Sequence, residues 1–351
     1  MNPILSLQAV DFLLAWYRTY RRDLPWRHTK DPYRIWISEI MLQQTRVEAV
    51  KPYYARFLEA CPTVQALAEL PEERLMKLWE GLGYYSRARN LQKAARTIVN
   101  ELDGRMPQSY EGLRALPGIG DYTAGAIASI AFDLRVPAVD GNVLRVLARV
   151  SGSTDDIAAQ ETKQRFRAEL AKVIPAEAGD FAQAMIELGA TVCVPNGAPK
   201  CALCPLASEC VAHLQGLTDF VPVRSAKKAR RVENRTVLLI RDGNRTALRK
   251  RAPKGLLAGL YELPNTEGHL SEAELPDYIR SLGTEPLQIQ RLEDAKHIFT
   301  HIEWHMIAYA VRVSPDFDGL REDADLLLVP NEELHRDYAI PSAFSAYTKY
   351  L

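Results

Sequence analysis

The sequence of 351 residues lacks the features of a membrane or secreted protein. Its longest apolar run, residues 124–132, is about half of the roughly 20 residues that span a bilayer. The N-terminal residues 1–17 contain Asp11 and no basic stretch, so they do not read as a signal peptide. Five cysteines are too few for a disulfide framework in a chain of this length. We therefore expect a cytoplasmic protein that binds no membrane.

Net charge is also absent, because 44 basic side chains balance 44 acidic ones. The two signs are nevertheless segregated along the chain. Residues 1–220 carry 25 of each, residues 221–254 carry 12 basic and 2 acidic side chains, and residues 255–351 carry 7 and 17. The basic segment is either a polyanion contact or a solvated linker. Its cations include Lys227, Lys228, Arg230 and Arg231.

Hydrophobic periodicity predicts two domains joined by a connector. Residues 1–216 repeat apolar side chains at intervals of three and four, which predicts an all-α domain with one helix over residues 33–50. Residues 217–232 are polar and basic and predict the connector. Residues 233–351 predict an α+β domain. Its expected elements are strands over 236–240 and 246–251 joined by a hairpin at Asp242-Gly243, a helix over 271–282 and one half-buried strand over 298–308.

Four of the five cysteines lie in the pattern Cys193-x7-Cys201-x2-Cys204-x5-Cys210. Four thiolates on one loop can bind a [4Fe-4S] cluster or a structural zinc ion, because sulfur ligands suit both. Zinc ribbons usually pair two Cys-x2-Cys units, and this loop contains one. The pattern therefore favours the cluster, with zinc as the alternative.

Two further segments are typical of DNA contacts. Gly118 and Gly120 separate predicted helices over 110–115 and 121–132, so the backbone can approach a phosphate and helical N–H groups can face it. This indicates a helix-hairpin-helix, although a plain turn has the same glycines and Asp121 is a poor neighbour for a phosphate. The second segment carries four cations, Arg87 among them, beside Tyr84 and Tyr85; it is a DNA surface or a solvated helix face.

Two carboxylates are candidates for acid–base chemistry. Glu39 falls on the apolar stripe of its predicted helix, and burial there would let it hold a proton near neutral pH, as a general acid must. A surface position at the edge of the stripe is the alternative. Asp140, in Asp140-Gly141-Asn142, precedes a predicted helix and could be only its N-cap.

Several motifs in chain order resemble the MutY-type adenine DNA glycosylases of the endonuclease III superfamily. They are Leu24-Pro25-Trp26-Arg27, residues 38–45, residues 79–87, the glycine hairpin, Asp140-Gly141-Asn142 and the cysteine loop. The resemblance implies a six-helix barrel lobe and a cluster lobe, followed by a Nudix-like domain. It also implies excision of adenine mispaired with 8-oxoguanine or guanine in double-stranded DNA, and we expect a monomer.

The resemblance assigns roles to individual residues. Glu39 would protonate the leaving adenine, and Asp140 would stabilise or capture the oxocarbenium-like sugar, supported by Tyr122 and Asn142. Gln44 and Tyr84 would probe the space left in the duplex. The base pocket would be lined by Trp26, Arg27, Leu42, Gln183 and Ile186. The turn Phe299-Thr300-His301 would contact 8-oxoguanine.

Departures from related families sharpen these expectations. Bifunctional relatives carry a nucleophilic Lys where this chain has Tyr122, which predicts a monofunctional enzyme rather than a glycosylase with lyase activity. The Nudix metal core is missing, which argues against a nucleotide-pool hydrolase. The first cysteine gap has seven residues instead of the six typical of the family. A non-catalytic DNA-binding protein with a cluster remains an alternative.

Overall fold

The computed structural model describes residues 4–226, 229–314 and 326–351. The chain divides into two compact units. Unit 1 comprises Met1–Glu69 and Arg89–Ala226, and unit 2 comprises Leu70–Ala88 and Lys227–Leu351. Lys227 and Lys228 of the basic segment lie outside the described residues. In the described part of the chain, no helix is both long enough and apolar enough to cross a membrane.

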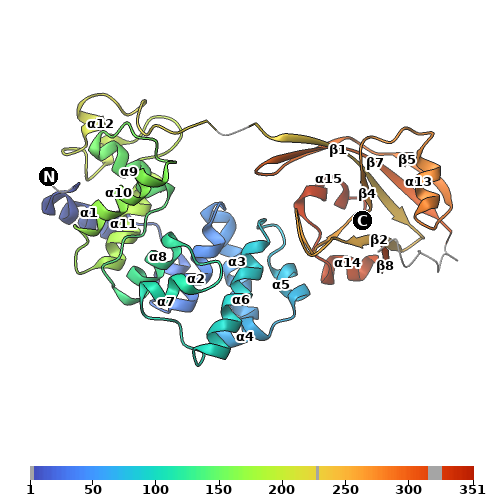
Figure 1. The fold of residues 1–351 in the computed structure, drawn as a ribbon, viewed down its shortest axis with the longest axis horizontal. Coiled ribbons are helices and arrows are strands. Elements are labelled where there is room, and N and C mark those ends of the chain that lie inside the picture. The colour runs from blue at the N-terminus through green and yellow to red at the C-terminus, as the bar shows by residue number, and fades with distance from the viewer. Residues whose placement is uncertain (1–3, 227–228, 315–325) are drawn as a thin grey trace. The chain divides into compact units, whose positions relative to one another are not determined.

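Unit 1 is helical, as its periodicity predicts (Figure 1). Its helices are α1 (Leu7–Tyr20), η1 (Pro25–Arg27), α2 (Pro32–Leu42), α3 (Val47–Ala60), α4 (Val64–Glu69), α6 (Ser86–Glu101, which begins in unit 2), α7 (Tyr110–Ala115), α8 (Asp121–Phe132), α9 (Gly141–Ser151), α10 (Gln160–Ala171), α11 (Ala178–Thr191), η2 (Cys201–Leu203) and α12 (Val211–Leu214). One hydrophobic core joins α1, α9, α10 and α11 to the cysteine loop.

Helix α8 is the buried centre of unit 1 and packs against α2, α7 and α11. Its residues from Thr123 to Ile130 are all buried. A Cβ atom at Gly125 would lie 2.4 Å from the Pro137 carbonyl oxygen, so only glycine allows this close approach. These contacts fix α8, and with it Tyr122, against α2, which carries Glu39.

The single helix predicted over residues 33–50 is wrong, because the structure breaks it into α2 and α3. Asp31 caps α2 by accepting a hydrogen bond from the Tyr33 N–H, and Pro32 opens the helix, as expected. The helix ends at Leu42, and Gln44 adopts a left-handed backbone conformation with φ of 59°. The apolar stripe continues into α3, so periodicity alone could not reveal this break.

The described residues of unit 2 form an eight-stranded mixed sheet, and the unit also includes the segment Leu70–Ala88 with α5 (Glu72–Leu78). The strands are β1 (Arg231–Arg241), β2 (Arg245–Lys250), β3 (Tyr261–Glu262), β4 (Asn265–Glu267), β5 (Pro286–Arg291), β6 (Ala295–Ile298), β7 (Ile302–Val313) and β8 (Leu326–Pro330). Besides α5, its helices are α13 (Leu275–Ser281), α14 (Asn331–Asp337), η4 (Ser342–Phe344) and α15 (Ser345–Thr348).

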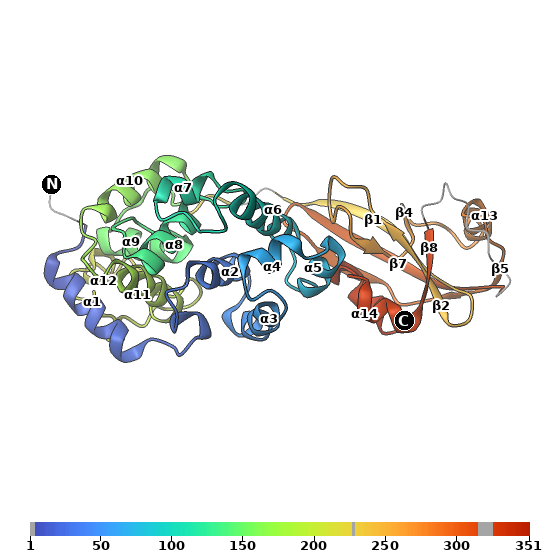
Figure 2. The same ribbon diagram turned by 90° about the horizontal axis from the view of Figure 1, so that it is seen from below.

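Strands β1 and β7 are parallel neighbours in the middle of the sheet (Figure 2). On β1, Val237 and Leu239 face a core with α14, η4 and α15, while Leu238 and Ile240 face a second core with α13. Helices therefore cover both faces of the sheet, as in an α+β domain.

The single strand predicted over residues 298–308 is also wrong. Ile298 ends β6, and β7 begins at Ile302 as its antiparallel partner. A tight turn at Phe299–His301 separates them, closed by a hydrogen bond from the Phe299 N–H to the Ile302 carbonyl at 2.8 Å. The hairpin predicted at Asp242-Gly243 joins β1 to β2, and the predicted helix over 271–282 contains α13.

Candidate active site and cysteine pocket

Glu39 lies inside unit 1 and is 6% exposed. The Tyr122 hydroxyl donates a hydrogen bond of 2.6 Å to the Glu39 Oε2 atom. Burial raises the pKa of Glu39 to about 7, the negative charge of Asp140 adds to the rise, and the Tyr122 hydrogen bond and the positive charge of Arg27 oppose it. The carboxyl can therefore hold a proton near neutral pH. Its burial excludes the alternative of a surface glutamate.

Asp140 is the N-cap of α9 and also a neighbour of Glu39. One of its carboxylate oxygens accepts hydrogen bonds from the backbone N–H groups of Asn142 and Val143, at 2.9 and 2.8 Å. The other accepts the Asn142 side-chain amide at 2.8 Å. Burial holds the pKa of Asp140 above its usual value, and these hydrogen bonds and the positive charge of Arg145 offset only part of the rise. Asp140 thus combines a capping role with a carboxylate held by three donors.

Asn142 links this carboxylate to the cysteine loop through a buried arginine. The Arg145 guanidinium donates to the Asn142 side-chain oxygen at 2.8 Å and to the Cys193 carbonyl at 2.7 Å. A Cβ atom at Gly189 would lie 2.6 Å from the Asn142 Cβ, so glycine lets α11 approach this point. The position of Asn142 is therefore fixed from both sides.

The residues expected to line a base pocket come from three elements of unit 1. Trp26 and Arg27 lie on η1, Leu42 ends α2, and Gln183 and Ile186 lie on α11. Trp26 is buried with its ring edge against Tyr54, at a centroid distance of 5.5 Å. Arg27 is close enough to Glu39 to affect its pKa. The fold therefore gathers Arg27 and Glu39 from segments that the sequence separates.

Glu187, which follows Ile186 on α11, is not among the residues predicted from the sequence. Its side chain is 1% exposed and binds the guanidinium groups of Arg22 and Arg27. The signal in the sequence is an acid inside the mostly apolar run of residues 181–190, the same signal that marks Glu39. Periodicity shows that such an acid is buried but does not identify its partners.

Gln44 and Tyr84, the residues expected to probe the duplex, both have left-handed backbones, with φ of 59° and 46°. Strained backbones of this kind often occur at functional sites. Tyr84 is 48% exposed, and within unit 2 its hydroxyl lies 2.8 Å from the Thr300 hydroxyl. Arg87 donates to the carbonyls of Leu82 and Gly83, so its guanidinium holds the Tyr84 loop. Two predicted site residues thus meet at Tyr84 and Thr300.

The glycine hairpin has the geometry expected for it. Gly118 has a φ of 76°, and a Cβ atom there would lie 2.6 Å from the Asn90 Cβ. Gly120 is the N-cap of α8 and has open space around it. Asp121 pairs with Arg114 at 2.6 Å and faces Arg167 at 3.7 Å. These cations compensate the negative charge that made Asp121 an unfavourable neighbour for a phosphate.

Two arginines of the connector, Arg230 and Arg231, hold the turn Phe299–His301. Arg230 donates through its Nε atom to the Phe299 carbonyl at 3.1 Å, and the Arg231 N–H donates to the His301 carbonyl at 3.0 Å. Thr300 and His301 are exposed. The Phe299 ring packs against Trp304 at a centroid distance of 4.9 Å. The turn therefore presents two polar side chains on an anchored aromatic base.

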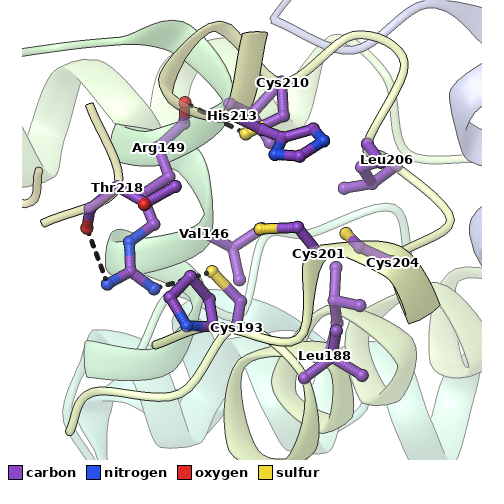
Figure 3. A pocket seen from close by; sticks show the side chains of 14 residues that line it. Val146, Arg149, Leu188, Cys193, Cys201, Cys204, Leu206, Cys210, His213 and Thr218 are labelled. Atoms are coloured by element: carbon purple, nitrogen blue, oxygen red, sulfur yellow. Dashed lines mark hydrogen bonds between the residues drawn. The ribbon is translucent and has the colours of Figure 1, made fainter. Parts of the chain in front are cut away.

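All four cysteines of the loop line one pocket in unit 1 (Figure 3). Its wall is otherwise mostly apolar and includes Leu188 and Leu206. Arg149 donates a hydrogen bond of 3.3 Å to the Cys193 sulfur and also binds the Val194 and Val221 carbonyls. Cys61, as expected, is a buried side chain outside this pocket. Among the described residues, no three His, Cys, Asp or Glu side chains are arranged to hold a metal ion.

Sequence and structure comparisons agree on the class of protein. Residues 37–175 match the HhH-GPD superfamily of base excision DNA repair proteins, and residues 236–350 match the NUDIX domain. A thermostable thymine-DNA glycosylase matches with a TM-score of 0.54 and 30% identity, over 59% of this chain and 95% of its own. A non-covalent endonuclease III–DNA complex matches with a TM-score of 0.51 and 25% identity, over 61% and 99%. The helical part therefore has the helix-hairpin-helix glycosylase fold.

The curated relatives narrow this class to one family. The adenine DNA glycosylase of Mus musculus is 37% identical over 85% of this chain and 69% of its own length. That of Buchnera aphidicola subsp. Baizongia pistaciae is 34% identical over 86% of this chain and 84% of its own. The chain belongs to the adenine DNA glycosylase family, which confirms the resemblance found in the sequence.

Proposed function

We propose that this protein hydrolyses the N-glycosidic bond of adenine mispaired with 8-oxoguanine or guanine in duplex DNA. The observation that carries the proposal is the pair Glu39 and Asp140. Glu39 is buried, with a pKa of about 7, while Asp140 accepts three hydrogen bonds. Two carboxyl groups in different environments are the usual means of cutting a glycosidic bond, one as an acid and one as an anion.

The reaction begins when the adenine leaves the base stack, because its glycosidic bond is inaccessible inside the duplex. Glu39 then donates its proton to the departing adenine. The sugar develops positive charge. The anionic Asp140 carboxylate either stabilises this charge or forms a covalent adduct with the sugar. Water completes the hydrolysis, and Tyr122 and Asn142 hold the two carboxyl groups in place through their hydrogen bonds.

The remaining predicted residues supply binding and recognition. Trp26, Arg27, Leu42, Gln183 and Ile186 line the adenine pocket, and Gln44 and Tyr84 enter the space that the adenine leaves. Gly118 and Gly120 contact a phosphate through backbone N–H groups. The exposed side chains of Thr300 and His301, with Phe299 beneath them, contact the 8-oxoguanine.

The enzyme is proposed to be monofunctional. A lyase forms a Schiff base between a Lys amine and the sugar, and Tyr122 occupies the position of that amine in bifunctional relatives. The Tyr122 hydroxyl is instead committed to Glu39. Borohydride should therefore trap little covalent enzyme–DNA product, and strong trapping would overturn this assignment.

The four cysteines are proposed to bind a [4Fe-4S] cluster. Zinc ribbons usually pair two Cys-x2-Cys units, whereas this loop has one such unit and its four cysteines line one mostly apolar pocket. The Arg149 hydrogen bond to Cys193 is of the kind that tunes cluster sulfurs. Visible charge-transfer absorption with matching iron content tests this, and active, iron-free, zinc-loaded protein would refute it.

The test of function is single-turnover adenine release from duplexes with A:8-oxoguanine, A:guanine and A:cytosine pairs. We expect release from the first two, fastest from A:8-oxoguanine. Binding without release would favour the non-catalytic DNA-binding alternative. Hydrolysis of free 8-oxo-dGTP would favour a nucleotide-pool enzyme. The Asp140→Asn variant is the control, since it should bind the same duplexes without releasing adenine.

A further inference from the structure

Glu187 is a buried charge to which the proposed reaction assigns no role. It accepts hydrogen bonds from the backbone N–H of Arg22 at 3.0 Å and from the Arg22 Nε and Nη2 atoms at 2.8 and 2.7 Å. A fourth hydrogen bond comes from the Arg27 Nη2 atom at 2.7 Å. A fully buried carboxylate with four donors is costly to form and is stable only as a complete network.

The network keeps Glu187 ionised. Burial alone would raise the pKa of Glu187, but the hydrogen bonds from Arg22 and Arg27 outweigh it and lower the pKa to about 2. Glu187 is therefore an anion across the whole range in which a glycosylase works. It supplies one fixed negative charge to the two guanidinium groups.

Arg27 depends on this network for its position. Its Nη2 atom binds Glu187, its Nη1 atom donates to the Arg22 carbonyl at 2.9 Å, and its guanidinium lies 5.5 Å from the centre of the Tyr17 ring. The side chain is 7% exposed. Glu187 thereby ties the turn η1 to α11, the helix that also carries Gln183 and Ile186.

We propose that Glu187 is a positioning residue that holds Arg27 in the adenine pocket and offsets its positive charge beside Glu39. The inference rests on the proposed glycosylase function, because it extends the acid–base role of Glu39. Without Glu187, the Arg27 charge would attract the anionic form of Glu39 more strongly. Glu39 would then lose its proton at a lower pH and act as a general acid over a narrower range.

The groups that act on Glu39 come from three elements. Tyr122 on α8 donates a hydrogen bond to it, Asp140 before α9 adds a negative charge, and Arg27 on η1 adds a positive charge. Replacing Glu187 by Gln removes a negative charge near Arg27 and leaves the first two groups unchanged. The positive charge of Arg27 then acts on Glu39 without compensation, which lowers the pKa of Glu39.

The experiment is the pH dependence of single-turnover adenine release by Glu187→Gln. We expect the basic limb to move down by roughly half to one pH unit, which makes the rate up to about tenfold lower on the alkaline side. Glu177→Gln is the matched control. Glu177 is an exposed acid at the start of the same helix, and its carboxylate pairs with Arg18 at 3.3 Å. The control should leave the limb where it is.

A double-mutant cycle tests whether Glu187 acts through Arg27. In an Arg27→Met background, Glu187→Gln should shift the limb much less than in the wild type. Full additivity, or an unshifted limb in folded Glu187→Gln, would overturn the inference. If Glu187→Gln does not fold, Arg22→Met carries the test. It leaves Glu187 to Arg27 alone, so the limb should move to higher pH, and an unchanged or lower limb would overturn the inference.

A second readout does not require catalysis. Thermal stability is measured between pH 4 and pH 8 for each protein and for the same protein carrying Glu39→Gln. The difference between the two curves reports the ionisation of Glu39. The Glu187→Gln protein should complete this ionisation at lower pH than the wild type. If the wild type releases no adenine but the ionisation shifts as expected, the proposed function is wrong and the positioning role stands. If it releases adenine and neither measurement shifts, only the inference is wrong.

Discussion

Tyr122→Phe should move the pH profile of adenine release in the opposite direction. In the structure the Tyr122 hydroxyl donates to the Glu39 carboxyl at 2.6 Å, and both groups are enclosed in unit 1. The hydrogen bond stabilises the anionic form of Glu39 and so opposes the rise that burial causes in its pKa. Phe keeps the ring and removes only the donor. The pKa of Glu39 should therefore rise further in the variant.

The size of the shift follows from the strength of the lost hydrogen bond. A hydrogen bond to a charged group contributes about 1.5–3 kcal/mol, and one pKa unit corresponds to about 1.36 kcal/mol. The protonated carboxyl of Glu39 can also accept the Tyr122 hydroxyl, so part of this energy is common to both protonation states. We expect a net upward shift of roughly one unit, from a midpoint near the present pKa of about 7.

The assay is single-turnover adenine release from an A:8-oxoguanine duplex between pH 5 and pH 9.5. A general acid acts while protonated, so the rate falls as pH rises through its pKa. The plateau rate should fall as well, because Tyr122 holds Glu39 in place. Tyr110→Phe is the matched control, since it removes a hydrogen bond of 3.1 Å to the exposed Asp121. A basic limb that stays in place or moves to lower pH in Tyr122→Phe would refute the reasoning.

Substitutions at three positions test single features of the site. Asp140→Asn should keep the α9 cap and the fold while base release is lost, whereas Asp140→Ala should also cost about 1 kcal/mol of stability in a denaturant titration. The pKa of Glu39 is higher in the folded protein, so its ionisation costs stability as pH rises from its unfolded value of 4.5 through about 7. Glu39→Gln should thus stabilise the protein by up to about 3 kcal/mol at pH 8 and little at pH 4; an equal gain at both would contradict this. Gln44→Gly should be about 1 kcal/mol more stable than Gln44→Ala, because φ is 59° there; equal thermal melting of the two would speak against backbone strain.

Local chemistry and periodicity predict the features that depend on neighbouring residues. The cap at Asp31-Pro32 and helix α8 from its first to its last residue follow from patterns within one or two helix turns. The hairpin at Asp242-Gly243 is equally local. These features were predictable because no distant residue is needed to decide them.

The rest of the site depends on contacts between distant segments. The break after Leu42 interrupts a stripe whose apolar residues continue into α3, so the period is the same with or without it. The turn Phe299–His301 is held by Arg230 and Arg231, about 70 residues earlier in the chain. Glu187 and Arg27 are 160 residues apart. No local pattern carries this information.

Ion pairs within unit 2 account for part of the charge segregation seen in the sequence. Several cations of the basic segment lie on β1, on β2 or directly after β2, and they pair with acids of the same unit. Arg249 and Arg251 both contact Glu262, and Arg235 contacts Glu267 at 3.6 Å. These guanidinium groups are therefore compensated within the domain, and they release few counterions when DNA binds. The salt dependence of DNA binding should consequently be shallower than 12 basic side chains in residues 221–254 would suggest.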